Sequence, residues 1–148
     1  MIIVDSREKK WEHIRNYFEQ SNIPYKDRIK LDVGDYFNPD YPYVVVDRKC
    51  GLQEVCNNLS RGKENYHRFL KECRRAHERR MKLIVLIEGT KMKSLDEVIN
   101  WHSQFSTHTG SWLLHEMKHL STMYRVEWCF CQKKNTAEEI LRLTHYER

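Results

Sequence analysis

The sequence lacks the features that would place the chain in a membrane, in a fibre or outside the cell. No uninterrupted apolar run approaches the roughly 18 residues of a membrane-spanning helix, so no membrane partner is expected. The first residues carry no basic stretch ahead of an apolar segment, so we expect a chain that is not secreted. Hydrophobic residues make up 40% of the chain and no internal repeat is present, which excludes a collagenous or disordered protein.

The number of cysteines is odd. The chain has 5 cysteines in 148 residues, which argues against a disulfide framework. No pair of C-x-x-C units is present either, which argues against a structural zinc site. We therefore expect a reducing compartment, the cytoplasm or, in a eukaryote, the nucleus. At this length, residues 1–148 should form one domain with a sizeable core.

The net charge of +5 is concentrated in one segment. Between Arg61 and Lys82 the local charge is +6, and the rest of the chain sums to −1. Such a cluster is typical of a surface that binds a polyanion, because each phosphate contact releases condensed counterions. The alternative, from these residues alone, is an exposed helix whose charges keep it soluble.

Strand and helix periodicities alternate along the chain. β-Branched runs predict strands, and apolar residues three or four apart predict helices. The expected strands are Met1–Asp5, Tyr25–Val33, Tyr43–Arg48, Leu83–Ile87 and Arg125–Phe130. The expected helices are Lys9–Ser21, Leu52–Leu59, Glu64–Arg80, Ser94–Phe105, Thr109–Tyr124 and Thr136–His145. This alternation predicts an α/β fold with a mixed central β-sheet flanked by helices.

A predicted hairpin gathers charged residues at one point. The segment Asn38–Pro42 predicts a tight reversal, so the arm before it should bring Asp35 near the strand Tyr43–Arg48. Residues two apart in a strand share a face, so Asp47 and Lys49 should project together. Two carboxylates beside a lysine can hold Mg²⁺ or Mn²⁺ against a phosphodiester. The plainer alternative is a solvated ion pair at a strand end.

Further charged residues follow the first expected strand. Asp5, Arg7 and Glu8 lie where active-site groups gather in α/β sheets, at the carboxyl ends of strands. The alternative is that Asp5 or Ser6 caps the following helix and Glu8 complements its positive end. Both interpretations stay open from the residues alone.

Three short motifs, Ile3–Glu8, Val33–Tyr36 and Val46–Lys49, occur in this order and read I-V-D-S-R-E, V-G-D-Y and V-D-R-K. Together they resemble the nuclease domain of the XPF/Hef-type structure-specific endonucleases, a branch of the PD-(D/E)xK-like nucleases. That family's pattern is V-D-x-R-E, then G-D-Y, then V-E-R-K with an acid four residues after the lysine. Leu59–Lys63 and Leu83–Gly89 are similar to the segments that follow, so the resemblance covers most of the chain.

The resemblance implies a restriction-endonuclease-like fold and a role for each charged residue. Asp35 and Asp47 would bind Mg²⁺ or Mn²⁺, with the Arg48 carbonyl oxygen as a third ligand. Lys49 would be the catalytic lysine. The other expected contributions come from Asp5, Arg7 and Glu8, which would position water or phosphate, and from Arg61, Lys63 and Arg68, which would contact the DNA backbone.

Two positions depart from the family pattern. Asp47 stands where the family has glutamate, which shortens the carboxylate by one methylene. Four residues after Lys49 the chain has Gln53, and the acid Glu54 comes one residue later. The main charged groups persist, so the resemblance favours an active enzyme.

The expected function is therefore that of a Mg²⁺- or Mn²⁺-dependent DNA endonuclease, acting on branched, flapped or single-stranded DNA in repair or recombination. The resemblance also implies a homodimer or a nuclease-like partner subunit. The two departures keep open a catalytically silent module that binds DNA or supports a partner. A restriction- or resolvase-like enzyme with the same metal site is a third hypothesis.

The aromatic and histidine residues of the C-terminal half are expected to be structural. Trp101, Trp112 and Trp128 are predicted as core or interface anchors rather than platforms for bases. His115 and His119 share a helical face, but the glutamate of an H-E-x-x-H metal site is missing between them.

Overall fold

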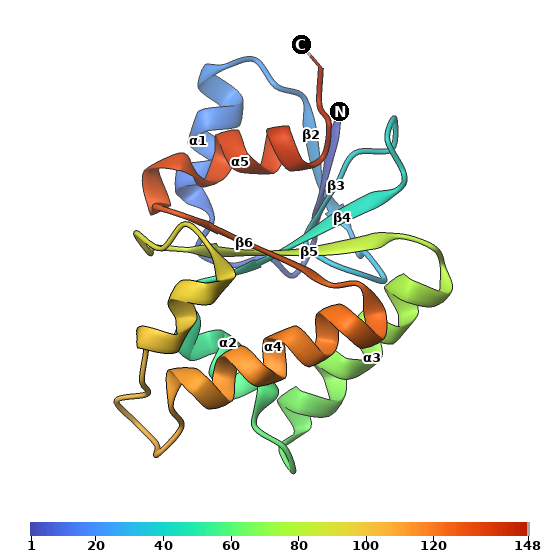
Figure 1. Ribbon diagram of the computed structural model, residues 1–148. Helices are drawn as coiled ribbons and strands as arrows, with labels where there is room; N and C mark the ends of the chain where they lie inside the picture. The colour runs from blue at the N-terminus through green and yellow to red at the C-terminus, as the bar shows by residue number, and fades with distance from the viewer. Residues whose placement is uncertain (148) are drawn as a thin grey trace.

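One mixed β-sheet forms the centre of the structure. Figure 1 shows the computed structural model, which describes residues 1–147. The strands are β1 (Ile2–Asp5), β2 (Tyr25–Ile29), β3 (Tyr36–Phe37), β4 (Val44–Lys49), β5 (Lys82–Glu88) and β6 (Glu127–Cys131). They lie in the order β2-β1-β3-β4-β5-β6. β3 is antiparallel to both of its neighbours and the other pairs are parallel.

Helices cover both faces of the sheet. They are α1 (Glu12–Gln20), α2 (Leu52–Leu59), α3 (Glu64–Glu78), α4 (Gly110–Tyr124) and α5 (Thr136–Leu143), with two 3₁₀ helices, η1 (Leu95–Asn100) and η2 (Lys133–Asn135). α1 and α5 lie on one face, and α2, α3 and α4 on the other (Figure 1). The predicted α/β fold with a mixed central sheet is therefore confirmed.

Strand β4 shows how the sequence separates the two layers. Val44 packs in the layer with α1 and α5, and Val45 packs in the layer with α2, α3 and α4. Because alternate residues of a strand point to opposite faces, Asp47 and Lys49 continue the Val45 face and Arg48 continues the Val44 face. Neighbouring charged residues of one strand thus enter different layers.

The prediction of a strand at Tyr25–Val33, paired in a hairpin with Tyr43–Arg48, is wrong in where the strand ends and in its partner. The strand ends at Ile29 and pairs in parallel with β1, and the first arm of the hairpin is the two-residue strand β3. The chain leaves the sheet after Ile29 because the backbone N–H of Leu31 donates a hydrogen bond to the Asp5 carboxylate, at 2.8 Å. Local alternation of apolar residues did not reveal this long-range contact.

The helix expected at Ser94–Phe105 is shorter and is the 3₁₀ helix η1. Its predicted capping box between Ser94 and Glu97 is present. The chain turns away soon after η1 because Gly110, at the start of α4, packs against backbone carbonyls of this segment. A Cβ at Gly110 would lie 2.2 Å from the Val98 carbonyl oxygen. This close backbone approach fixes the loop that joins η1 to α4.

Two findings concern membrane-spanning helices and disulfide bonds. None of the helices within residues 1–147 combines the length and apolar character needed to cross a bilayer. The five cysteines, which all lie in this range, are free thiols. The structure therefore has no disulfide framework.

Gly34 allows the hairpin to close against β4. Its φ of +71° lies in the left-handed region, and a Cβ there would lie 2.4 Å from Val45 Cγ2. Its backbone N–H donates a hydrogen bond to Glu72 Oε1, at 2.9 Å. Only glycine meets both demands, and the next residue is Asp35.

We predict that Gly34→Ala lowers the free energy of unfolding by about 2–4 kcal/mol, because left-handed strain and an overpacked contact add together. Urea denaturation checks the value. Gly62→Ala is the matched control, since Gly62 has a φ of +83° but a Cβ there would have nothing within 4 Å. Equal losses in the two variants would contradict the close packing at Gly34.

Candidate active site

Two carboxylates meet at one edge of the sheet, where β3 begins and β4 ends. The antiparallel register pairs Tyr36 with Val46, which places the preceding residue Asp35 opposite Asp47. The backbone N–H of Arg48 donates a hydrogen bond to Asp35 Oδ2, at 2.9 Å. Residues directly opposite in such a ladder have Cβ atoms about 4.5–5.5 Å apart, so the two carboxylates share one face of the sheet.

Lys49 brings a cation to the same face. Its Nζ lies 3.1 Å from Asp47 Oδ2 and 3.9 Å from Glu54 Oε2. The ammonium also lies 5.0 Å from the centroid of the Phe69 ring. Burial acts to lower the pKa of Lys49, but the charges of Asp47 and Glu54 outweigh it and raise the pKa above its usual value. Lys49 therefore stays charged at neutral pH.

The two carboxylates repel each other. Burial, followed by the negative charges of Asp47 and Glu8, raises the pKa of Asp35 well above its usual value. Asp47 Oδ2 is buried and accepts no hydrogen bond among the described residues, and Lys49 is its ion-pair partner. A divalent cation between the two carboxylates would relieve this repulsion.

Two neighbouring carboxylates are a donor set that suits a hard cation such as Mg²⁺ or Mn²⁺. Within residues 1–147, no group of three or more His, Cys, Asp or Glu side chains is arranged to hold a metal ion. Mg²⁺ is commonly held by only one or two carboxylates, with water and substrate phosphate as its other ligands. Asp35 and Asp47 supply that number of carboxylates.

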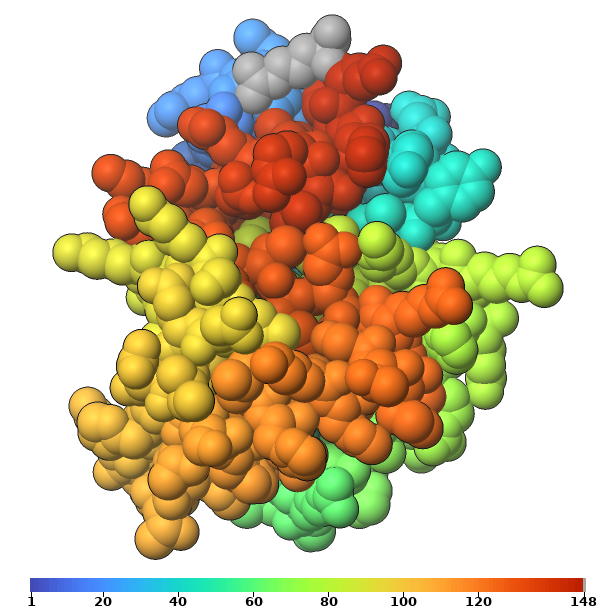
Figure 2. All heavy atoms as spheres, viewed as in Figure 1, coloured from blue at the N-terminus to red at the C-terminus, as the bar shows by residue number. Residues whose placement is uncertain are grey.

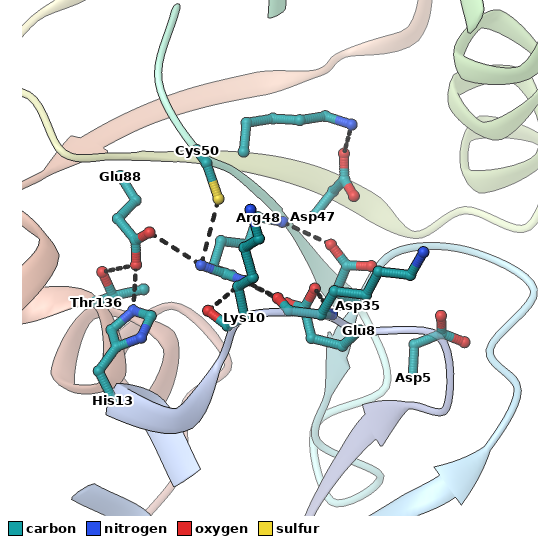
Figure 3. A network of polar contacts seen from close by, with 12 residues as sticks. Asp5, Glu8, Lys10, His13, Asp35, Asp47, Arg48, Cys50, Glu88 and Thr136 are labelled. Atoms are coloured by element: carbon teal, nitrogen blue, oxygen red, sulfur yellow. Dashed lines mark hydrogen bonds and ion pairs between the residues drawn. The ribbon is translucent and has the colours of Figure 1, made fainter. Parts of the chain in front are cut away.

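The Arg48 side chain lies on the opposite face, in a buried ionic network (Figure 3). Its guanidinium donates to Glu8 Oε2 at 3.0 Å, to Glu88 Oε2 at 2.9 Å and to the Lys9 carbonyl oxygen at 2.7 Å. The Arg48 side chain is only 2% exposed. The guanidinium thus ties the loop after β1 to β4 and β5, while the expected role of the Arg48 carbonyl as a metal ligand stays a prediction.

Glu88 extends this network to the helices of the same layer. It accepts hydrogen bonds from Thr136 Oγ1, at 2.7 Å, and pairs with the His13 ring (Figure 3). Burial acts to raise the pKa of Glu88, but the hydrogen bonds from Thr136 and His13 and the charge of Arg48 lower it below its usual value. Glu88 therefore links β5 to α1 and α5 as a carboxylate.

Asp5 and Arg7 form a local pair at the rim. Asp5 accepts hydrogen bonds from Arg7 Nε, at 3.0 Å, and from the Leu31 backbone N–H, at 2.8 Å. The Asp5 carboxylate lies apart from the Asp35–Asp47 pair (Figure 3). It does not cap α1, which begins at Glu12, so the capping interpretation is wrong. Asp5 holds the loop after β2, and Arg7 stays 60% exposed.

A cleft of about 740 Å³ opens beside these groups. All of the residues predicted for catalysis or metal binding line it, and so does Arg68 from the predicted DNA contacts. Arg61 and Lys63 line a separate hollow on the other side of α2. All but two of the predicted site residues therefore line this cleft, and Asp35, Asp47 and Lys49 are the ones that meet on one face of the sheet.

The sequence matches a known domain family. A family model for the ERCC4 domain matches residues 4–143. The chain belongs to the ERCC4 domain family. The sequence has no match among curated proteins.

Two solved structures have the same fold as this ERCC4 domain. XPF from Aeropyrum pernix aligns with a TM-score of 0.71 and 20% identity, over 97% of this chain and 63% of that chain. The same protein in complex with DNA aligns with a TM-score of 0.69 and 20% identity, over 97% and 62% of the two chains. The resemblance to an XPF-type nuclease domain is therefore confirmed, and the chain spans less than two thirds of that relative.

Sequence reasoning missed Glu72 of the ERCC4 domain. Glu72 lies on α3 and lines the cleft, where burial and then the charge of Asp47 raise its pKa to about 7. Gln53, at the position of the family's last acid, instead accepts a hydrogen bond from Ser103 Oγ, at 3.0 Å. The spacing of Glu72 three residues after the buried Phe69 was the available signal, because both then face inward from the helix.

We predict that Arg48→Met lowers the free energy of unfolding by about 3–5 kcal/mol, because it leaves Glu8 and Glu88 buried without their cation. Urea denaturation measures the loss. Arg142→Met is the control, since Arg142 pairs with Glu139 at the surface and such pairs contribute under about 1 kcal/mol. Similar losses in the two variants would show that the buried network is not a structural support.

We also predict that the stability of the fold depends on the ionisation of Glu88 in acid. Its folded-state pKa is lowered from 4.5, so the stability it contributes is present above that pH and is lost as the pH falls through the folded-state pKa. Glu88→Gln should therefore lower stability at neutral pH and flatten the decline in acid. Urea midpoints across the acid range check this, and an unchanged acid slope would contradict it.

Proposed function

We propose that this ERCC4 domain is a DNA endonuclease that uses Mg²⁺ or Mn²⁺ to hydrolyse phosphodiester bonds. The observation that supports it is the pairing of Asp35 with Asp47 across the β3–β4 ladder, with Lys49 Nζ 3.1 Å from Asp47. The DNA complex of the structurally similar XPF supports DNA as the partner.

Each residue of the site has a separate task in this proposal. Asp35 and Asp47 would hold the ion, which supplies positive charge to the phosphodiester transition state. Lys49 would orient the attacking water or stabilise the developing negative charge. Arg68, Lys71 and Arg75, on the α3 side of the cleft, would hold the flanking phosphates.

The finer properties rest on the family resemblance. We propose that residues 1–148 act as one nuclease domain on branched, flapped or single-stranded DNA in repair or recombination. A homodimer, or a complex with a nuclease-like partner subunit, is part of the same proposal. The free thiols support a reducing compartment, the cytoplasm or the nucleus.

One observation favours a second candidate, a catalytically silent DNA-binding or scaffolding module. The acid expected four residues after Lys49 is missing, and Gln53 faces the separate hollow rather than the cleft. Glu54 and Glu72 both line the cleft, which supports the active enzyme.

A cleavage assay separates these candidates. Purified protein is incubated with labelled duplex, single-stranded and forked DNA in Mg²⁺, Mn²⁺ or EDTA. We expect metal-dependent cutting, and a loss of roughly 100-fold or more in rate for Asp47→Asn and for Lys49→Met, because each removes a charge that acts in the transition state.

The matched control is Asp32→Asn, since Asp32 lies at the rim of the same cleft but pairs with Arg79. This variant should cut at nearly the wild-type rate. Binding without cutting in every metal condition would favour the silent module. Cutting by Asp47→Asn at the wild-type rate would show that the site is assigned wrongly.

A further inference from the structure

A second hollow lies next to the cleft, on the other side of α2. It has a volume of about 400 Å³ and is formed by α2, the segment after it and the loop between η1 and α4. Helix α2 separates the cleft from the hollow. Glu54 and Asn58 line the cleft, and their neighbours Gln53 and Asn57 line the hollow. A polymer that lies in the cleft can therefore continue over α2 into the hollow.

The loop presents an aromatic ring at the mouth of this hollow. Phe105 is 83% exposed, and its ring pairs with no other aromatic ring within residues 1–147. The loop projects from the body at the lower left of Figure 2, in light orange. A ring so exposed offers both of its faces for stacking against a planar partner.

Specific hydrogen bonds hold the backbone on which the Phe105 ring is carried. The buried Ser103 hydroxyl accepts the backbone N–H groups of Phe105 and Ser106, both at 3.1 Å. The same hydroxyl donates to Gln53 Oε1, at 3.0 Å. The loop is thus anchored to α2, and the ring is presented by a defined turn.

A second ring system lines the wall. His108 stacks on Trp112 with ring centroids 3.8 Å apart and an interplanar angle of 14°. Trp112 packs against the core as expected from the sequence, and its outer face carries the imidazole. Two aromatic surfaces, Phe105 and the His108–Trp112 stack, therefore face one hollow.

The polar groups of the hollow suit a nucleotide. Arg61 and Lys63 line it, and no acidic residue does. The Arg61 side chain is 66% exposed, and its Nε lies 3.6 Å from Glu116 Oε1, so it keeps donors free for a phosphate. Asn57 Oδ1 accepts from Gln53 Nε2, at 3.1 Å, which leaves the Asn57 amide nitrogen without a partner in the described chain. That amide can donate to the edge of a base.

We propose that this hollow holds an unpaired nucleobase of the DNA strand whose scissile phosphate lies in the cleft. A base would stack on the aromatic surfaces, as in proteins that bind single strands, while Arg61 and Lys63 hold its phosphates. The proposal rests on the proposed function for the strand in the cleft, and it makes an unpaired segment beside the cut a requirement for tight binding.

Binding without cleavage tests this proposal independently of catalysis. A fluorescein-labelled oligothymidine of about 12 nucleotides, within the range of single-strand site sizes, is titrated in EDTA and followed by anisotropy. Phe105→Ala should weaken binding by roughly 5- to 150-fold, the loss typical of removing one stacking ring. Phe105→Tyr should restore wild-type affinity, because it keeps the ring.

Ile99→Ala is the matched control, since Ile99 is an exposed apolar residue of the neighbouring η1 that does not line the hollow. It should bind as wild type, and a fully paired duplex should bind Phe105→Ala and wild type equally.

Unchanged single-strand affinity in Phe105→Ala, or the same loss on duplex DNA, would overturn the proposal. Normal cleavage with no effect of Phe105→Ala would remove only the nucleobase site. A clear Phe105 effect in a protein that never cuts would remove only the nuclease proposal.

Discussion

Two like charges held opposite each other are the constraint on which the site depends. The β3–β4 ladder places Asp35 across from Asp47, and burial together with the charge of Asp47 raises the pKa of Asp35 well above its usual value. Such a pair is unfavourable unless a proton or a cation joins it. Lys49 is the single cation that contacts Asp47 among the described residues, so the pair keeps the capacity for a divalent ion.

The opposite face of β4 supplies the rigidity that such a pair needs. Arg48 is buried between Glu8 and Glu88, and through Glu88 it is connected to α1 and α5. Its backbone N–H also donates to Asp35, so the same residue belongs to both layers. The two-residue period of the strand therefore sends the Arg48 guanidinium and the Lys49 ammonium, which we propose acts in catalysis, to different faces.

Much of the site could be predicted from the sequence because its signals are local. The reversal before Tyr43 and the alternation through Lys49 are short patterns, and they placed Asp35, Asp47 and Lys49 together. The partners of Arg48 and of Gly34 could not be predicted. Glu88 lies 40 residues from Arg48, Glu72 lies 38 residues from Gly34, and only the folded sheet and α3 bring them into contact.

The most direct measurement is a crystal structure of the wild-type protein grown with Mn²⁺, with anomalous scattering used to locate the ion. The account predicts an anomalous peak between the carboxylates of Asp35 and Asp47, with water at the remaining coordination positions. A peak only at histidines such as His115 and His119, or carboxylates that turn apart with no ion between them, would contradict it.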